Sequence, residues 1–357
     1  MYTMIGNTTD RARFAEVLDS VQSDAIMRNI GNLPGSFASK VIKGREYWYY
    51  QYTDIDSSLR QIYVGADSDH IRKLISAKRL QSNNDHIKEL VLEMIKSGYV
   101  ATDNKQYKII KKIADYGFFA AGGVLAGTHA FIAIGNLLGV RWAEGGQTKD
   151  VDFAHAGKSI AIVLPTSLKP DLHDAISSLE MGFIPMSAFN GKHAASYVNP
   201  ESKDERIDFL TTVTGLSLEP VFIKDLNISL QPLKFMELSL SSVDRALVIP
   251  STGKDAVAVN IPNPVFFAIH KLIVAIERGV SNPKSDKDIR QAAAIMDFYV
   301  DNNPVSLRDA WNETMLRGSG WSKRMKGGMA RLVSNLPSVG AKITAAIKMP
   351  DMPKPRL

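Results

Sequence analysis

Two acidic residues, Asp150 and Asp152, flank a single valine in the stretch TKDVDFA, residues 148–154. Because side chains alternate between the two faces of a β-strand, both carboxylates share one face and Val151 and Phe153 the other. Strand interiors disfavour aspartate, and two anions about 6–7 Å apart repel each other. The pattern leaves two interpretations open: a solvated acidic face at a strand end, or a site where Mg²⁺ or Mn²⁺ binds between the carboxylates.

Other residues with relevant chemistry lie elsewhere in the chain. Asp208 is one acid within the hydrophobic run RIDFL, and such an acid is expected to be solvated, paired or functional. The Gly122-Gly123 pair separates YGFFAA from VLAGTHAFIAIGNLL, which predicts a turn between a buried strand and a helix. The stretch HAGKS, residues 155–159, is not a phosphate-binding P-loop, because Asp152 occupies the position of the first glycine.

The composition is that of an ordinary soluble protein, with 357 residues of which 45% are hydrophobic and 22% charged. The absence of cysteine excludes disulfides, thiolate metal sites and a cysteine nucleophile. The first residues lack a basic segment followed by an apolar run, so a cytoplasmic location is expected. Residues 116–140 contain no Asp, Glu, Lys or Arg but six glycines, which favours a turn, a strand and a helix over a membrane span. No membrane partner is expected.

An α+β organisation in four parts is predicted. Residues 1–105 should form helices, including one over 10–30, and a β-hairpin made from the aromatic runs KVIKGREYWYYQYTD and LRQIYVG. Residues 106–262 mix strands and helices around the Gly-Gly turn and should form a mixed-sheet core. Residues 263–316 show a helical pattern, and residues 317–357 form a basic tail.

Positive charge is concentrated in this tail. The whole chain carries +6, whereas residues 317–357 carry +8 from nine Lys/Arg and one acid, so the preceding residues sum to −2. Such a tail is typical of polyanion binding and equally of a solubilising terminus. In the predicted hairpin, Tyr47 and Tyr49 share one face, and Trp48, Tyr50 and Tyr52 share the other. One face should pack, and the other, with Lys43, Arg45 and Arg60 nearby, suits either cross-strand packing or stacking on bases. RNA or another polyanion is therefore a candidate partner through the tail and the hairpin.

The Gly-Gly turn, the DVD strand and the RIDFL strand together resemble the core of the polymerase-beta-like nucleotidyltransferase superfamily. Within it, GGVLAGTHAF followed by TKDVDFA resembles a bacterial family of predicted nucleotidyltransferase-fold proteins, and more distantly AbiEii-like toxins. The segments HKLIVAIERG and KSDKDIRQA resemble paired helical segments of those toxins, which places Lys271 and Asp288 beside the nucleotide. The resemblance covers most of residues 30–300. It departs in one respect, because 26 residues lie between Gly123 and Asp150, more than in compact members.

The resemblance implies a mixed sheet with the nucleotidyltransferase fold. It also implies an enzyme that transfers a nucleoside monophosphate from an NTP to a hydroxyl acceptor, and RNA, including tRNA, is a candidate acceptor. Asp150, Asp152 and Asp208 would be catalytic and would hold Mg²⁺ or Mn²⁺. The residues expected to bind the nucleotide are Gly122, Gly123, Thr148, Lys271, Arg278, Lys284 and Asp288. The helical part, residues 263–316, would close the nucleotide cleft. Two alternatives remain: a non-catalytic nucleotide- or nucleic-acid-binding module, and a toxin or phage-defence component with the same fold.

Overall fold

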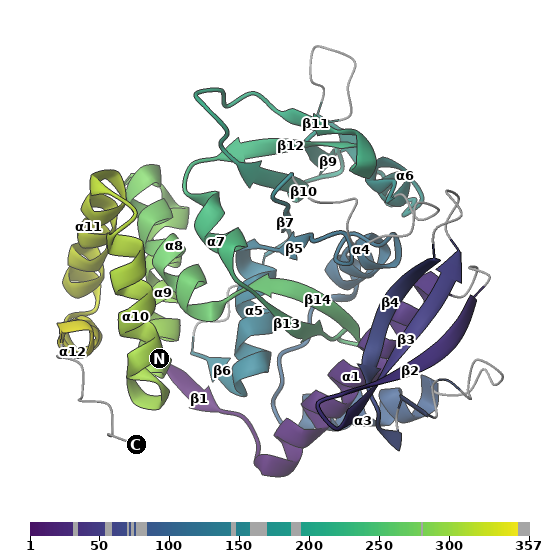
Figure 1. Ribbon diagram of the computed structural model, residues 1–357. Helices are drawn as coiled ribbons and strands as arrows, with labels where there is room; N and C mark the ends of the chain where they lie inside the picture. Colours follow the sequence, from purple (N-terminus) through teal and green to yellow (C-terminus); the bar gives the residue numbers. More distant parts are fainter. Residues whose placement is uncertain are drawn as a thin grey trace.

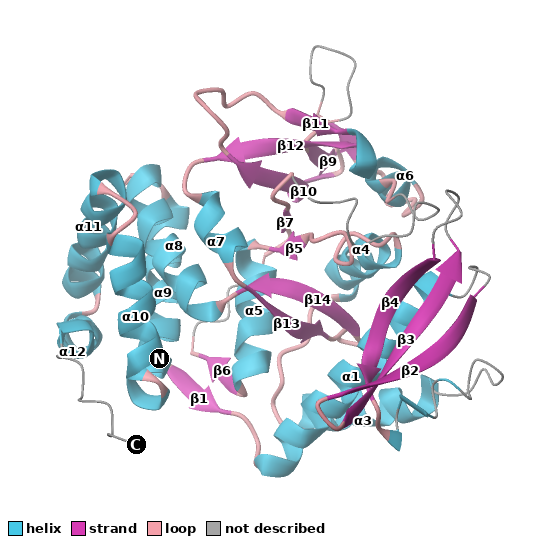
Figure 2. Cartoon of the chain, viewed as in Figure 1, coloured by secondary structure: helices cyan, strands magenta, loops and turns pink. Residues whose placement is uncertain are grey.

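A mixed β-sheet lies at the centre of the molecule (Figures 1 and 2). The computed structural model describes residues 1–30, 35–53, 59–69, 71–72, 75, 84–143, 148–157, 170–186, 194–279 and 281–348. In spatial order the strands are β11 (Val221–Ile223), β12 (Ile228–Leu233), β10 (Ser202–Thr212), β7 (Val151–Ala154) and β5 (Val124–Leu125), with β9 (Ser196–Asn199) on β10 and β8 (Ile184–Pro185) on β9. Strand β10 runs parallel to β7 and β12, whereas β5, β9 and β11 pair antiparallel with their neighbours. The predicted α+β mixed-sheet fold is confirmed.

The pairing of β7 with β10 sets the register of the acids. Asp208 pairs with Asp152, and Phe209 pairs with Phe153. Val151 and Phe153 are completely buried, and Phe153 stacks on Phe209 with ring centroids 5.3 Å apart. Because side chains alternate along a strand, this buried hydrophobic face leaves Asp152 and Asp208 together on the opposite face. The alternation predicted for TKDVDFA is therefore confirmed.

The uncharged segment 116–140 is part of the folded core. It contains β5, helix α5 (Gly127–Leu138) and the start of β6 (Val140–Trp142), which pairs with β1 (Tyr2–Met4). Helix α4 (Asn104–Asp115) precedes it and buries its isoleucine face, and the short helix α6 (Leu172–Ser177) packs beside α4. Of the helices that the structure describes, none is long and apolar enough to cross a membrane.

Three helices after the sheet begin at the same local signal. In α8 (Pro264–Arg278), α9 (Pro283–Asn302) and α10 (Pro304–Met315), an asparagine N-cap accepts a backbone N–H and proline takes the first helical position. The short helix α7 (Met236–Ser241) and the hairpin β13 (Val243–Val248)–β14 (Val257–Pro262) connect them to the sheet. The 3₁₀ turn η2 (Lys224–Leu226) joins β11 to β12 within the sheet. One hydrophobic cluster runs through both predicted parts, residues 106–262 and 263–316.

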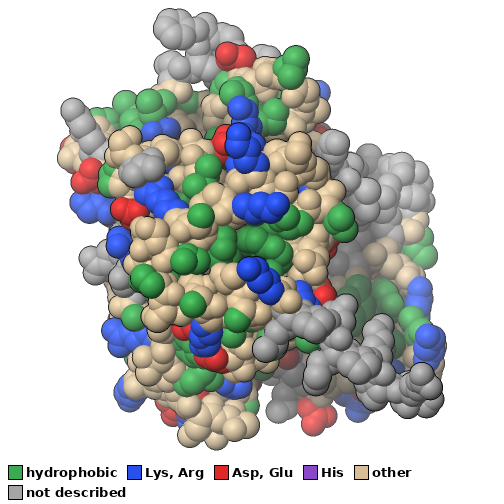
Figure 3. Space-filling view, turned by 90° about the vertical axis from the view of Figure 1, so that its left-hand side faces the viewer, with side chains coloured by type: hydrophobic (Ala, Val, Ile, Leu, Met, Phe, Trp, Pro, Cys, Tyr) green, Lys and Arg blue, Asp and Glu red, His purple; other side chains and the backbone are tan. Residues whose placement is uncertain are grey.

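The basic tail predicted over residues 317–357 is wrong for its described part, which ends at residue 348. Helices α11 (Ser319–Asn335) and α12 (Pro337–Lys348) pack on the preceding helices and bury Met325, Leu332 and Ile343 completely. Four of the seven described Lys/Arg of this cap pair with acids: Arg317 with Glu313, Arg324 with Glu277, Arg331 with Asp286, and Lys342 with Asp297 and Asp301. Figure 3 shows this face, with basic side chains scattered among hydrophobic and uncharged ones. The segment is a folded cap whose cations largely neutralise acids.

The N-terminal part also differs from its prediction. Helix α1 (Thr8–Ile30) confirms the helix expected over 10–30 and packs on α3 (Asn84–Lys96). The predicted hairpin is instead a three-stranded antiparallel sheet of β2 (Gly35–Ile42), β3 (Arg45–Thr53) and β4 (Leu59–Ala66). The extra turn lies inside the first aromatic run, where Lys43 and Gly44 both have positive φ (52° and 77°), the backbone of a two-residue hairpin turn. The polar turn expected between the aromatic runs lies outside the described residues.

Candidate active site

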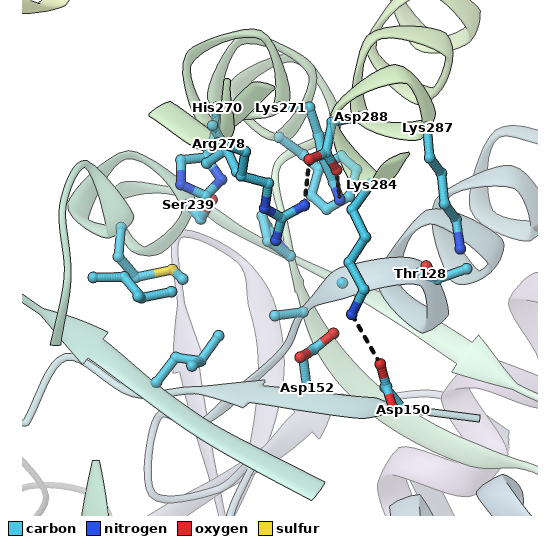
Figure 4. Close-up of a pocket in the computed structure, with 18 of the residues that line it drawn as sticks. Thr128, Asp150, Asp152, Ser239, His270, Lys271, Arg278, Lys284, Lys287 and Asp288 are labelled. Carbon is cyan, nitrogen blue, oxygen red and sulfur yellow. Dashed lines mark hydrogen bonds and ion pairs between the residues drawn. The ribbon is translucent and has the colours of Figure 1, made fainter. Parts of the chain in front are cut away.

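A cavity with an empty volume of about 850 Å³ opens between the sheet and helices α7, α8 and α9 (Figure 4). This volume includes open solvent at the mouth of the cavity. Seven of the ten predicted site residues line it: Thr148, Asp150, Asp152, Lys271, Arg278, Lys284 and Asp288. Gly122, Gly123 and Asp208 are outside this lining. The fold therefore brings together residues that are more than a hundred positions apart in the chain.

Asp150 and Asp152 form the acidic side of the cavity. Among the described residues no hydrogen-bond donor contacts the Asp152 carboxylate, whose pKa is raised to about 6 by burial and then by the charge of Asp208. Asp150 lies just before β7, where its backbone N–H donates to Thr148 Oγ1 at 3.3 Å. Its carboxylate accepts from Lys284 Nζ at 3.1 Å. The two predicted metal ligands thus face one cavity, and one of them lacks a counter-charge in contact.

Asp208 lies beside Asp152 on the neighbouring strand, as the register requires. Its carboxylate accepts from Arg206 Nε at 2.7 Å and from Ser196 Oγ at 2.5 Å. It is therefore close to the acidic pair, but in the structure it is held by an arginine of its own strand. Arg206 and Asp208 are two positions apart on β10 and therefore share a face of that strand.

These carboxylates fit a divalent cation by their chemistry. The donors are oxygens only, as Mg²⁺ and Mn²⁺ prefer, and the charge on Asp152 lacks direct compensation. Among the described residues, no three His, Asp or Glu side chains already form a metal cluster. Lys284 pairs with Asp150 and Arg206 pairs with Asp208, so each cation occupies a carboxylate that a metal would use.

The opposite wall of the cavity is cationic and is organised by one buried acid. Asp288 on α9 is 2% exposed and accepts from Lys271 Nζ at 2.7 Å and from Arg278 of α8. The Lys271 ammonium also lies 5.3 Å from the ring centroid of Phe267. Figure 4 shows both cations converging on Asp288 at the cavity wall. Lys271 is part of the cavity lining.

Lys287, which sequence reasoning missed, contributes a further cation. It lines the cavity one turn after Lys284, and within the described part of the chain no hydrogen bond or ion pair holds it. Burial lowers its pKa, and the charge of Lys271 lowers it further. Lys287 lies close enough to the start of α5 to affect His129. Burial lowers the pKa of His129 to about 4, and the charge of Lys287 contributes to this lowering. Figure 4 shows the Lys287 amine extending toward Thr128.

The helix expected directly after Gly122-Gly123 begins later in the chain. Strand β5, not a helix, follows these glycines, and the Gly123 carbonyl accepts from Asn260 Nδ2 at 2.7 Å inside the protein. The two-residue strand Val124–Leu125 is too short to show the alternating hydrophobic pattern of a strand. The sequence therefore predicts one helix that includes these two residues. The glycine pair therefore forms a turn outside the cavity lining, with Gly122 exposed and Gly123 buried.

Helix α5 begins five residues after Gly122, at Gly127, which lines the cavity. Gly127 has φ +61°, and a Cβ at this position would lie 1.9 Å from Asp152 Oδ2, so glycine permits the helix start to touch the acid. Ala126 provides no side-chain cap and the first turn holds no acid, which leaves the N-terminal N–H groups open to an anion. From Gly127 to Asp150 the interval is 22 residues, shorter than that from Gly123.

The remaining half of the cavity is apolar. It is lined by side chains from β10, β12, α7, β14 and α8: Leu210, Leu233, Met236, Pro262, Phe267 and Val274. Ser239 and His270 add two polar groups, and burial lowers the pKa of His270 to about 3, so its ring is neutral. No motif could mark these residues, because only the fold brings their five elements together.

An acid-bearing mixed sheet, an uncapped helix start and a cationic helical wall around one cavity are the features of a nucleotidyltransferase-type protein. A family model described as nucleotidyltransferase matches residues 104–316, which is more than half of the chain. The chain belongs to this nucleotidyltransferase family. The predicted superfamily is confirmed at this level, while the bacterial family and the AbiEii-like relationship stay predictions.

Among solved structures, the chain is similar to the crystal structure of an antigenic nucleotidyltransferase-like protein from Paracoccidioides brasiliensis. The two share 14% sequence identity over 70% of this chain and 97% of that one, with a TM-score of 0.35. No curated protein matches the chain.

Proposed function

We propose that the protein transfers a nucleoside monophosphate from an NTP to a hydroxyl acceptor in a reaction that depends on Mg²⁺ or Mn²⁺. One observation carries the proposal: a single cavity joins the Asp150/Asp152 pair to the open start of α5 and to the cationic wall. Carboxylates suit metal ions, and an open helix start with nearby lysines suits phosphate. An NTP bound with a divalent cation satisfies both halves at once.

Asp150 and Asp152 are the residues proposed to hold the metal, with Asp208 joining them from β10. When bound, such ions neutralise triphosphate charge and stabilise the attacking and leaving oxygens. Lys284 is 67% exposed, so its ammonium can leave Asp150 for a phosphate oxygen without unpacking the core. Arg206 is likewise partly exposed and can release Asp208. Asp150 and Asp208 are thus kept paired until the substrate supplies a better partner.

The triphosphate is proposed to lie against the N–H groups at Gly127 and Thr128, with Lys271 and Lys287 as counter-charges. Asp288 is proposed to act through Lys271, which it positions by an ion pair, and not by binding the nucleotide itself. The nucleoside would then extend into the apolar half of the cavity, where neutral His270 and Ser239 offer hydrogen bonds. This orientation assigns each half of the cavity to one half of the substrate.

The proposal is tested by incubating the full-length chain with each α-labelled ribonucleoside triphosphate, Mg²⁺ or Mn²⁺, and total RNA. Label is expected to move from at least one NTP into an acceptor, with RNA as the expected recipient. Label on the protein itself or on a small molecule would show that the acceptor is not RNA, while the proposed transfer reaction would stand. NTP binding without transfer under either metal would contradict the enzyme and leave the non-catalytic binding module.

Lys271→Ala is expected to raise the KM for NTP about tenfold and to lower kcat, because charge-assisted hydrogen bonds contribute about 1.5–3 kcal/mol. Lys271→Arg should restore only part of the loss, since a planar fork replaces a compact charge. Steady-state kinetics with the identified NTP provides the measurement. The control is Lys326→Ala, which removes an exposed lysine of α11 outside the cavity. An unchanged KM in Lys271→Ala would show that this lysine does not contact the nucleotide.

A further inference from the structure

The three-stranded sheet β2–β4 has two faces of different character. On the inner face Tyr50 is completely buried and packs with Val64 and Ile71. On the outer face Tyr47, Tyr49 and Tyr63 contact one another, with ring centroids 6.2 Å apart for Tyr47–Tyr63 and 5.5 Å for Tyr49–Tyr63. We call these three residues the tyrosine face. Tyr63 is 51% exposed, and the other two rings are partly exposed.

The surroundings of the tyrosine face are basic. Strand alternation and register place Lys40 and Arg45 on the same side, with Lys40 opposite Tyr47. The Lys40 ammonium lies 4.9 Å from the ring centroid of Tyr49. Glu46 is the sole acid in the three strands, and alternation directs it to the other face. The outer face thus combines aromatic rings with positive charge and carries no acid.

We propose that the tyrosine face binds single-stranded nucleic acid, with unpaired bases stacked on the rings and phosphates near Lys40 and Arg45. Aromatic rings interleaved with cations are the arrangement that binds single strands without reading sequence, and charge complementarity favours a polyanion. A buried packing role is already taken by the inner face and Tyr50. Duplexes fit poorly, because their bases are already stacked on one another.

The tyrosine face lies apart from the cavity, since Figure 1 shows β2–β4 and helices α8–α9 on opposite sides of the molecule, with β13–β14 between them. The idea that the tyrosine face docks the acceptor strand rests on the proposed function. The idea that it binds single-stranded nucleic acid does not, because such binding needs neither NTP nor metal. The two ideas can therefore fail separately.

The test measures binding of a fluorescein-labelled oligouridylate of about 12 nucleotides to the full-length chain by anisotropy, without NTP or metal. The double variant Tyr49→Thr/Tyr63→Thr keeps β-propensity but removes two rings, and it should bind at least about tenfold more weakly. Tyr63→Phe keeps the ring and should bind like the unsubstituted protein. Lys40→Gln should reduce the log–log salt slope by about 0.7, the value for one phosphate contact on a single strand.

Val41→Thr is the matched control, because Val41 is exposed on the opposite face of the same sheet. It should leave binding unchanged, and Asp152→Asn should leave it unchanged as well. Melting curves establish that each variant is folded; should the double variant unfold, Lys40→Gln and Tyr63→Thr alone decide the question. The proposal is overturned if the unsubstituted protein does not bind the oligonucleotide, binds duplex RNA equally well, or binds unchanged after the ring substitutions.

Discussion

Asp152→Asn is expected to lower nucleotidyl transfer by roughly 10³-fold, equivalent to about 4 kcal/mol of transition-state stabilisation. The substitution keeps the side-chain shape while removing the charge that the proposed metal needs. Asp152 is the acid of the cavity without a donor in contact among the described residues, so a cation is its natural partner. Transfer kinetics, together with Mn²⁺ titration in the presence of NTP, should show both weaker metal binding and lost turnover.

The same variant should be more stable than the unsubstituted protein at neutral pH. The folded-state pKa of Asp152, about 6, exceeds its ordinary value of 3.8, so ionising this carboxyl opposes folding. Below about pH 4 the group is protonated in both states and the penalty is absent; it grows as pH rises and is complete above about pH 6. The penalty is on the order of 3 kcal/mol at most. Asp152→Asn should therefore raise the melting temperature at pH 7 but not at pH 4.

Asp204→Asn is the matched control for both measurements. Asp204 lies on the same strand as Asp208 and is 85% exposed, and its one ion pair among the described residues is with Lys149 at 3.9 Å. Its loss should change neither transfer nor stability. Full transfer by Asp152→Asn would remove the metal role of this acid, whereas lost transfer accompanied by lower stability at pH 7 would point to a structural role instead.

The parts of the site that follow local rules could be predicted from the sequence. The DVD alternation depends only on strand geometry, which is why the sequence alone predicts that Asp150 and Asp152 share one face. Lys271 and Asp288 followed from a resemblance of two helical segments, and the structure brings them into contact at 2.7 Å. These predictions needed no knowledge of which strands pair.

The parts that failed depend on long-range pairing. Val124 and Leu125 form a strand because they pair with β7, a pairing that local sequence does not reveal. The sequence therefore predicts that the helix starts directly after Gly122-Gly123 and not at Gly127. The basic tail was predicted by counting charges, but the partner of Arg331, Asp286, lies 45 positions away and is invisible to a count. Lys287 was missed because a lysine on a charged helix start carries no signal of its own.

Gly127→Ala is expected to reduce transfer by at least about 10²-fold and to weaken NTP binding, which would locate the phosphate turn at the start of α5. Two effects add at this position. The left-handed backbone costs about 1 kcal/mol for any residue with a Cβ. In addition, the new methyl group would lie 1.9 Å from Asp152 Oδ2, so either the helix start or the carboxylate must move.

Two matched variants separate these effects. Gly117→Ala carries the same left-handed strain, with φ +82°, but its Cβ meets nothing within 4 Å, so it should lose some stability and keep full transfer. Gly122→Ala tests the turn expected from the sequence: its φ is +93° and its Cβ would come 3.6 Å from His155 Nε2, outside the cavity. NTP affinity and kcat/KM should fall for Gly127→Ala alone. If instead Gly122→Ala abolishes NTP binding while Gly127→Ala binds normally, the triphosphate lies at the glycine pair and the open N–H groups of α5 have another role.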